Sequence, residues 1–100
     1  AASQHPRVLS MLAETYLRSG TMYNAAFGKQ LATQACIATN WLSPREMHVL
    51  AEAYYHTGDK LAALLTASKA KQAGSGLVGQ YAKSHHLDQL IESLTDGPLA

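Results

Sequence analysis

Apolar residues recur at helical spacing along most of the chain. In residues 44–57 they stand three or four positions apart, at Met47, Leu50, Ala51 and Tyr54, which places them on one helix face. The same periodicity predicts helices over about residues 6–19, 22–40, 44–57, 60–73 and 77–95. The pattern therefore indicates an all-α protein.

Residues that favour the start and the end of a helix define the bounds of the third predicted helix. Ser43 can cap its N-terminus, Pro44 suits the first helical position, and Glu46 stands three residues after the cap, where it would close a capping box. Gly58 is suited to end this helix, and Asp59 can cap the next one. Residues 44–73 therefore read as helix, tight turn, helix.

The chain contains an internal duplication. A shift of 38 residues aligns residues 6–20 with 44–58, and seven of these fifteen positions are identical. The identical pairs are Pro6/Pro44, Arg7/Arg45, Leu12/Leu50, Ala13/Ala51, Glu14/Glu52, Tyr16/Tyr54 and Gly20/Gly58. We expect the second helix of the first copy to be about one turn longer than its counterpart, which would account for the long period.

Residues 77–95 follow the two copies and are expected to close the domain. Helical repeats leave their last apolar face open, so a terminal helix is needed to cover it. The segment reads as one helix kinked near Ser84 or as two short helices. We therefore predict one domain over residues 1–100, with repeats at about 6–40 and 44–73 and a capping helix at about 77–95.

The two copies resemble the tetratricopeptide repeat family over about 65 of the 100 residues. The second copy carries the signature at Met47, Leu50, Ala51, Tyr54, Gly58, Ala63 and Ala70, and the first at Leu9, Leu12, Ala13, Tyr16, Gly20, Ala25 and Ala32. The resemblance implies tandem antiparallel hairpins in an α-α superhelix. The period of 38 departs from the family's 34, and neither copy ends in the usual Pro.

The resemblance also implies a partner-binding groove lined by the first helix of each hairpin. The residues between the signature positions would line it: Arg7, Ser10, Glu14, Leu17, Arg45, His48, Glu52 and Tyr55. Each of these positions can equally be a solvated helix position. Glu14 and Glu52 stand where a clamp for a C-terminal carboxylate needs Asn, so a basic, polar or helical apolar segment fits better.

The amino-acid composition limits the classes of molecule that the chain can bind. Charged residues make up 15% of the chain, against roughly 25% in typical domains, which indicates that part of the surface is covered. The net charge is +1 and no basic face is clustered, which argues against nucleic acid. No apolar run is long enough for membrane insertion. Two repeats are fewer than the roughly three of a stable solenoid, so we expect self-association into a homo-oligomer or stabilisation by a partner protein.

Catalytic and metal-binding chemistry finds no support in the sequence. The single cysteine, Cys36, excludes an intrachain disulfide and lies in an Ala-rich helix as a buried, inert thiol. His48, Glu52 and His56 share a helix face but span about 12 Å of its axis, so only a pair could share an ion. We predict no metal, no cofactor and no enzymatic activity.

Two aromatic features lie outside the predicted groove. His85 and His86 are adjacent and are expected to form a solvated kink. Trp41 precedes the second copy, where it is either a packing anchor or, if exposed, a hot spot for a partner.

The sequence thus predicts a protein–protein interaction module, with two settings left open. One is an adaptor domain within a larger protein, which a start other than Met favours. The other is a small chaperone or assembly subunit, for example of a secretion system, that sequesters a helical partner. The lone cysteine is typical of a reducing compartment, so we expect a cytoplasmic location.

Overall fold

Five helices make up most of the described part of the chain, which comprises residues 5–74 and 83–96 of the computed structural model. They are α1 (Pro6–Leu17), α2 (Ala25–Ala38), α3 (Pro44–His56), α4 (Lys60–Gly74) and α5 (Ser84–Asp96). No strand occurs in these residues, so the all-α prediction is confirmed.

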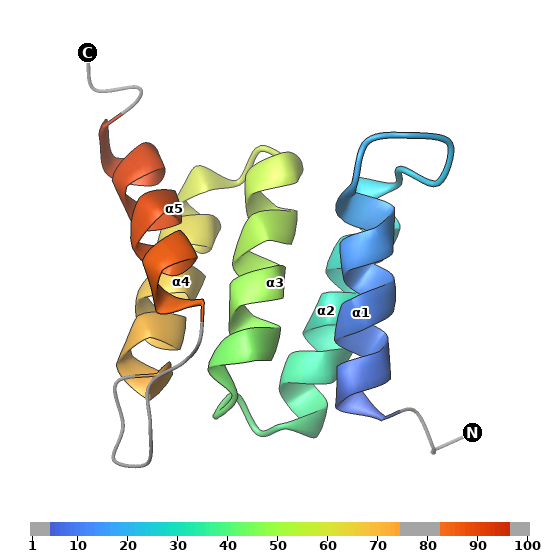
Figure 1. Cartoon of the computed structure of the whole chain (residues 1–100), viewed down its shortest axis with the longest axis horizontal. Helices are drawn as coiled ribbons and strands as arrows, with labels where there is room; N and C mark the ends of the chain where they lie inside the picture. Colours follow the sequence, from blue (N-terminus) through green and yellow to red (C-terminus); the bar gives the residue numbers. More distant parts are fainter. Residues whose placement is uncertain (1–4, 75–82, 97–100) are drawn as a thin grey trace.

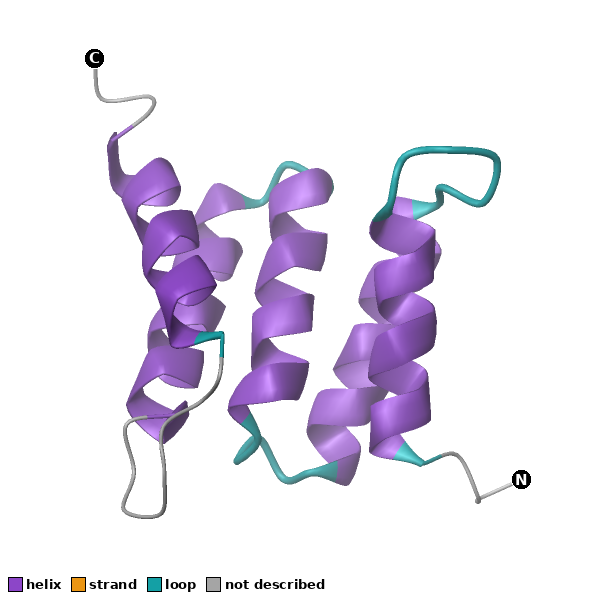
Figure 2. Ribbon diagram, in the orientation of Figure 1, coloured by secondary structure: helices purple, strands orange, loops and turns teal. Residues whose placement is uncertain are grey.

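The helices form two layers of hairpins. Figure 1 shows α1, α3 and α5 in the nearer layer with α2 and α4 behind. Figure 2 shows a wide loop joining α1 to α2 and a short one joining α3 to α4. Helix α3 packs against α1, α2 and α4, and α5 packs against α4. The side chain of Leu87 is fully buried, so α5 covers α4 as a terminal helix should. Residues 77–82 of the predicted capping helix lie outside the described residues.

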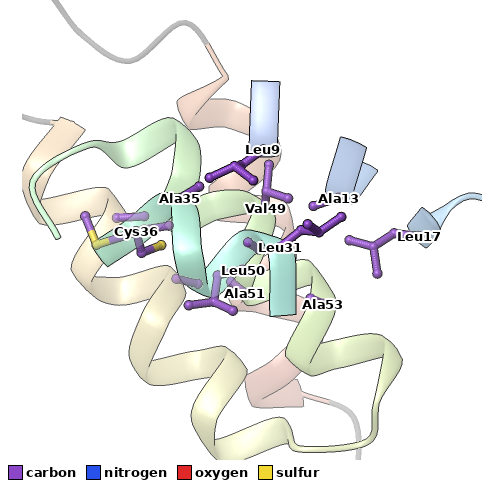
Figure 3. Close-up of a cluster of buried hydrophobic side chains, with 14 of the residues drawn as sticks. Leu9, Ala13, Leu17, Leu31, Ala35, Cys36, Val49, Leu50, Ala51 and Ala53 are labelled. Atoms are coloured by element: carbon purple, nitrogen blue, oxygen red, sulfur yellow. The ribbon is translucent and has the colours of Figure 1, made fainter. Parts of the chain in front are cut away.

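Small residues let the first three helices approach closely. Ala13, Ala32, Ala35 and Ala51 are fully buried, and larger apolar side chains fill the space around them (Figure 3). Gly28 marks the closest approach of α2 to α1. A Cβ there would lie 3.2 Å from the carbonyl oxygen of Ala13.

The first hairpin differs from the prediction in the position of α2. The helix begins at Ala25 because the side chain of Asn24 accepts a hydrogen bond from the Phe27 amide at 3.1 Å. It spans 14 residues against 15 in α4, so it is not the longer helix. The additional residues of the 38-residue period lie in the connectors at residues 18–24 and 39–43. The prediction that a long second helix sets the period was therefore wrong.

The second hairpin has the predicted turn and begins at the predicted Pro44, but the N-terminus of α3 is capped differently. Gly58 has a φ of +87°, and the Asp59 carboxylate accepts from the Ala62 amide at 3.1 Å, as an N-cap does. Ser43 precedes α3 but makes no side-chain hydrogen bond to the backbone. Its hydroxyl donates instead to Glu46, whose other carboxylate oxygen accepts from Ser10 at 3.3 Å. The predicted capping box is replaced by a link between α1 and α3.

Candidate binding groove between α1 and α3

Two hollows lie between α1, α3 and the residue that leads into α5. One has a volume of about 320 Å³ and the other of about 100 Å³. Glu14, Glu52 and Lys83 line both. The larger hollow is completed by Leu17, Arg18 and His56, and the smaller by His48, Val49 and His86. We call the two hollows together the α1–α3 groove.

Four of the eight predicted groove residues line this groove. They come from two helices, Glu14 and Leu17 from α1 and His48 and Glu52 from α3. The duplication accounts for the convergence of Glu14 and Glu52, which occupy the same register position on α1 and α3. The counterparts of Leu17 and His48, which are Tyr55 and Ser10, do not line the groove.

The other four predicted residues lie elsewhere. Ser10 is fully buried and donates to the Arg7 carbonyl and to Glu46, so it cannot reach a partner. Arg7 is exposed at the start of α1, and Arg45 lines a separate hollow along α1. Tyr55 is 45% exposed and its ring lies 5.8 Å from that of His56.

The sequence prediction missed five residues that line the groove, one of which is the buried Val49. Arg18 and His56 are equivalent positions in the two copies, each four residues after a predicted Glu, so the 38-residue register could have revealed them. Lys83 and His86 stand at the start of α5, outside the duplicated register. No signal within the two copies pointed to them.

The carboxylates of the groove carry negative charge that the chain does not fully balance. Burial raises the pKa of Glu52, and the nearby Glu14 raises it further. Lys83 acts in the opposite direction but does not cancel these two effects. A charged Glu52 is therefore costly in the free protein, and a cation placed beside it would be favourable.

His48 contributes a neutral side chain. Its Nε2 lies 3.6 Å from an Oε2 oxygen of Glu52, a spacing that would suit an ion pair. Burial, followed by the positive fields of Lys83 and His86, lowers the pKa of His48 from 6.5 to about 4. The imidazole is thus uncharged at neutral pH and does not balance Glu52.

Aromatic rings surround one end of the groove. His56 lies edge-on to Tyr23 at 6.1 Å and to Tyr55 at 5.8 Å between ring centroids. Tyr23 comes from the connector between α1 and α2, so this connector reaches the C-terminal end of α3. The end of the groove therefore offers flat, amphipathic contact surface of the kind that proteins use to bind partners.

Other chemical features lie outside the groove. Burial and the charge of Glu46 raise the pKa of Cys36 to about 12, so its thiol is unreactive. No three His, Cys, Asp or Glu residues are grouped to hold a metal ion in residues 5–74 and 83–96. Trp41 is 38% exposed, with the Lys69 ammonium 5.9 Å from its ring centre, so it combines packing with exposure.

No helix in the described ranges is long and apolar enough to cross a membrane. Comparison with known protein families, with characterised proteins and with solved structures gives no match. The fold and the groove are therefore the basis for a functional proposal.

Proposed function

We propose that this chain is a protein-interaction module of the tetratricopeptide type, which binds a partner segment in the α1–α3 groove. The observation that carries the proposal is that Glu14 and Glu52, from equivalent positions of α1 and α3, line the same two hollows. In keeping with this, burial and the nearby Glu14 raise the pKa of Glu52. Two carboxylates in a partly enclosed site repel each other, and a partner's cation relieves that repulsion. The aromatic rings at the end of the groove add apolar contact area.

The chemistry favours a partner segment with at least one Lys or Arg side chain. A guanidinium or ammonium between Glu14 and Glu52 would form charge-assisted hydrogen bonds with both carboxylates. Such a group would take over the electrostatic role that Lys83 fills only in part. A C-terminal carboxylate is disfavoured, because Glu14 and Glu52 would repel it.

Selection from a peptide library tests this proposal. The immobilised chain is used to select peptides of random sequence, and the selected peptides are expected to be enriched in Lys and Arg. The double variant Glu14→Gln, Glu52→Gln keeps the side-chain volumes and removes both charges. It is expected to bind the selected peptides at least about tenfold more weakly, since one lost charge-assisted hydrogen bond is worth at least about 1.5 kcal/mol.

A second double variant controls for net charge. Gln30→Lys with Gln34→Lys changes two exposed positions of α2 and raises the net charge by the same amount. It is expected to keep the peptide affinity of the native chain. If both variants bind the peptides equally weakly, the loss of affinity is due to net charge and not to the groove. If the groove variant binds them as tightly as the native chain, the groove is not the binding site.

Exposed apolar side chains favour a second candidate, a chaperone or assembly subunit. Ile37, Leu42, Leu61 and Leu65 are between 58% and 73% exposed, on α2, its following connector and α4. Large exposed apolar side chains of this kind are typical of surfaces that a partner covers. This candidate is supported if a folded helical partner binds and short peptides do not. The double variant Leu61→Glu, Leu65→Glu should then abolish binding of that partner.

A further inference from the structure

The two helices of the rear layer carry charges of only one sign. Helices α2 and α4 contain no Asp or Glu, and their charged residues are Lys29, Lys60, Lys69 and Lys71. Of the seven Asp and Glu residues of the chain, Asp59 precedes α4 and the other six lie on α1, α3 and α5. The layer that lies behind in Figure 1 is therefore basic, and the nearer layer holds most of the carboxylates.

The exposed face of α4 leads from apolar residues into a hollow. Leu61 and Leu65 are 68% and 62% exposed and stand one helical turn apart. Ser68 and Gln72 continue this face along the helix. The hollow has a volume of about 630 Å³ and lies between α4 and Ile91 of α5. None of the residues that line it belongs to the α1–α3 groove.

Two lysines flank this hollow, and they differ in their partners. The Lys71 ammonium lies 2.8 Å from a carboxylate oxygen of Asp88 on α5. Lys69 lies on the opposite flank of the exposed face and forms no ion pair with the residues that the structure describes. The lining of the hollow contains no carboxylate. The hollow therefore combines apolar side chains with a positive charge that no nearby acid balances.

Helix α5 shows which kind of helix packs against α4. It is amphipathic, its charged residues are all acidic, and its Leu87 is fully buried in the core. Asp88 stands next to Leu87 and pairs with Lys71. On this flank α4 thus accepts an acidic helix through leucine packing and a Lys–Asp pair. The flank with Lys69 offers the same chemistry without a helix among those that the structure describes.

Trp41 is held beside Lys69 by an unusual backbone conformation. Its φ is +58°, which bulky residues rarely adopt, and its amide donates to the Cys36 carbonyl at 2.9 Å. Strained backbone of this kind is concentrated at functional sites, where the surrounding structure maintains it. The turn presents a ring that is 38% exposed, with the Lys69 ammonium 5.9 Å from its centre. An exposed Trp of this kind is suited to be a binding hot spot.

We propose that one face of α4, together with the neighbouring Trp41, binds an acidic amphipathic helix of a partner protein. This α4 face consists of Leu61, Leu65, Lys69 and Trp41. The leucines contact apolar residues one turn apart on the partner, and Lys69 pairs with a carboxylate one turn further on. A hollow between two helices receives a ridge of side chains, which a helix has and a lipid surface lacks. The proposal rests on the second candidate function and does not depend on the α1–α3 groove.

Selection from a library of helical bundles tests this proposal. The library varies the exposed positions on one helix of a three-helix bundle that lacks Trp. The immobilised chain carries Glu14→Gln and Glu52→Gln, so that the groove carboxylates do not select partners. The selected helices are expected to combine Asp or Glu with large apolar residues three or four positions apart. Because Trp41 is the single tryptophan of the chain, its emission should shift to shorter wavelength when a bundle binds.

Two matched variants test the charge. Lys69→Gln is expected to weaken binding of the selected bundles about tenfold, because a charge-assisted hydrogen bond is lost. Lys60→Gln changes the net charge equally but lies on the opposite side of α4, so it should leave the affinity unchanged. If both variants weaken binding alike, the effect is one of net charge and the proposal is wrong.

Four other outcomes would also overturn the proposal. If Leu61→Glu with Leu65→Glu abolishes binding but the selected helices are not enriched in Asp and Glu, the second candidate function stands and the acidic partner is refuted. If Trp41 emission does not change, the bundles bind elsewhere. If no bundle is selected and phosphatidylserine-containing vesicles shift the emission, the face binds an anionic membrane surface. If the native chain sediments as a dimer that Lys69→Gln dissociates, a second copy occupies the face.

Discussion

His48 allows the electrostatics of the groove to be measured in the free protein, because its imidazole is buried and has a pKa of about 4. In the unfolded chain the same side chain is hydrated and titrates at 6.5. As the pH falls, the unfolded state therefore binds a proton first. The contribution of His48 to stability is complete above pH 6.5 and is lost progressively down to pH 4.

The magnitude follows from these two pKa values. The full difference corresponds to about 3 kcal/mol of unfolding free energy. Between pH 7 and pH 5 the expected loss is about 2 kcal/mol, since most of the unfolded chains but few of the folded ones carry the proton at pH 5. Glu52 acts in the opposite direction. Its raised pKa lets the folded state bind a proton before the unfolded state as the pH falls, which adds stability towards acid.

Urea unfolding at a series of pH values, followed by far-ultraviolet circular dichroism, measures this loss. His48→Gln removes the titrating group and is expected to flatten the fall in stability by about 2 kcal/mol between pH 7 and pH 5. Lys83→Gln removes one of the charges that lower the pKa of His48, so it is expected to flatten the fall in part. The chemical shift of the imidazole reports the pKa directly.

His85→Gln serves as the control, because it removes an exposed histidine at the start of α5. It should leave the pH dependence of stability as it is in the native chain. If His48→Gln and the native chain lose the same free energy between pH 7 and pH 5, then His48 is not held neutral by burial. The proposed charge balance of the groove would then fail with it.

Two further substitutions test the packing. Leu87→Ala removes the fully buried side chain that anchors α5, and it is expected to lower the free energy of unfolding by about 2–5 kcal/mol, with Leu61→Ala at an exposed position as its control. Gly28→Val forces side-chain atoms against the Ala13 carbonyl and Leu17, and is expected to lower the free energy of unfolding in urea by about 1–3 kcal/mol. Ala26→Val, on the exposed side of α2, is the control and should lower it by less than about 1 kcal/mol.

Local signals in the sequence were enough to predict the hairpins. Gly58 and Asp59 specify the turn between α3 and α4 through a positive φ and a side-chain cap, and both effects depend only on neighbouring residues. The buried alanines follow from helical periodicity. The start of α2 differs from the prediction because the helical pattern begins before Asn24, whereas the side chain of Asn24 caps the helix and fixes its start at Ala25.

The groove was only partly predictable, because its shape depends on how three helices meet. Glu14 and Glu52 could be found from the duplicated register alone. Ser10 occupies the same register as His48, yet α1 and α3 differ in their neighbours, and the Ser10 hydroxyl turns inward to Glu46. Lys83 precedes α5 and His86 lies in it, outside the duplicated part of the chain, so only the three-dimensional packing of α5 brings them to the groove.

The two copies show why residue identity does not determine exposure in a stacked fold. Leu12 and Leu50 are the same residue in the same register, but one is 43% exposed and the other fully buried. At the equivalent positions Val8 and Glu46, exposure is the opposite of what polarity would suggest, since the apolar residue is exposed and the acid is buried. Glu46 can be buried because the hydroxyls of Ser10 and Ser43 both donate to its carboxylate. Val8 and Leu12 are exposed because, among the described helices, none packs on the outer side of α1 (Figure 1), so the position of a helix in the stack decides which of its register positions are buried.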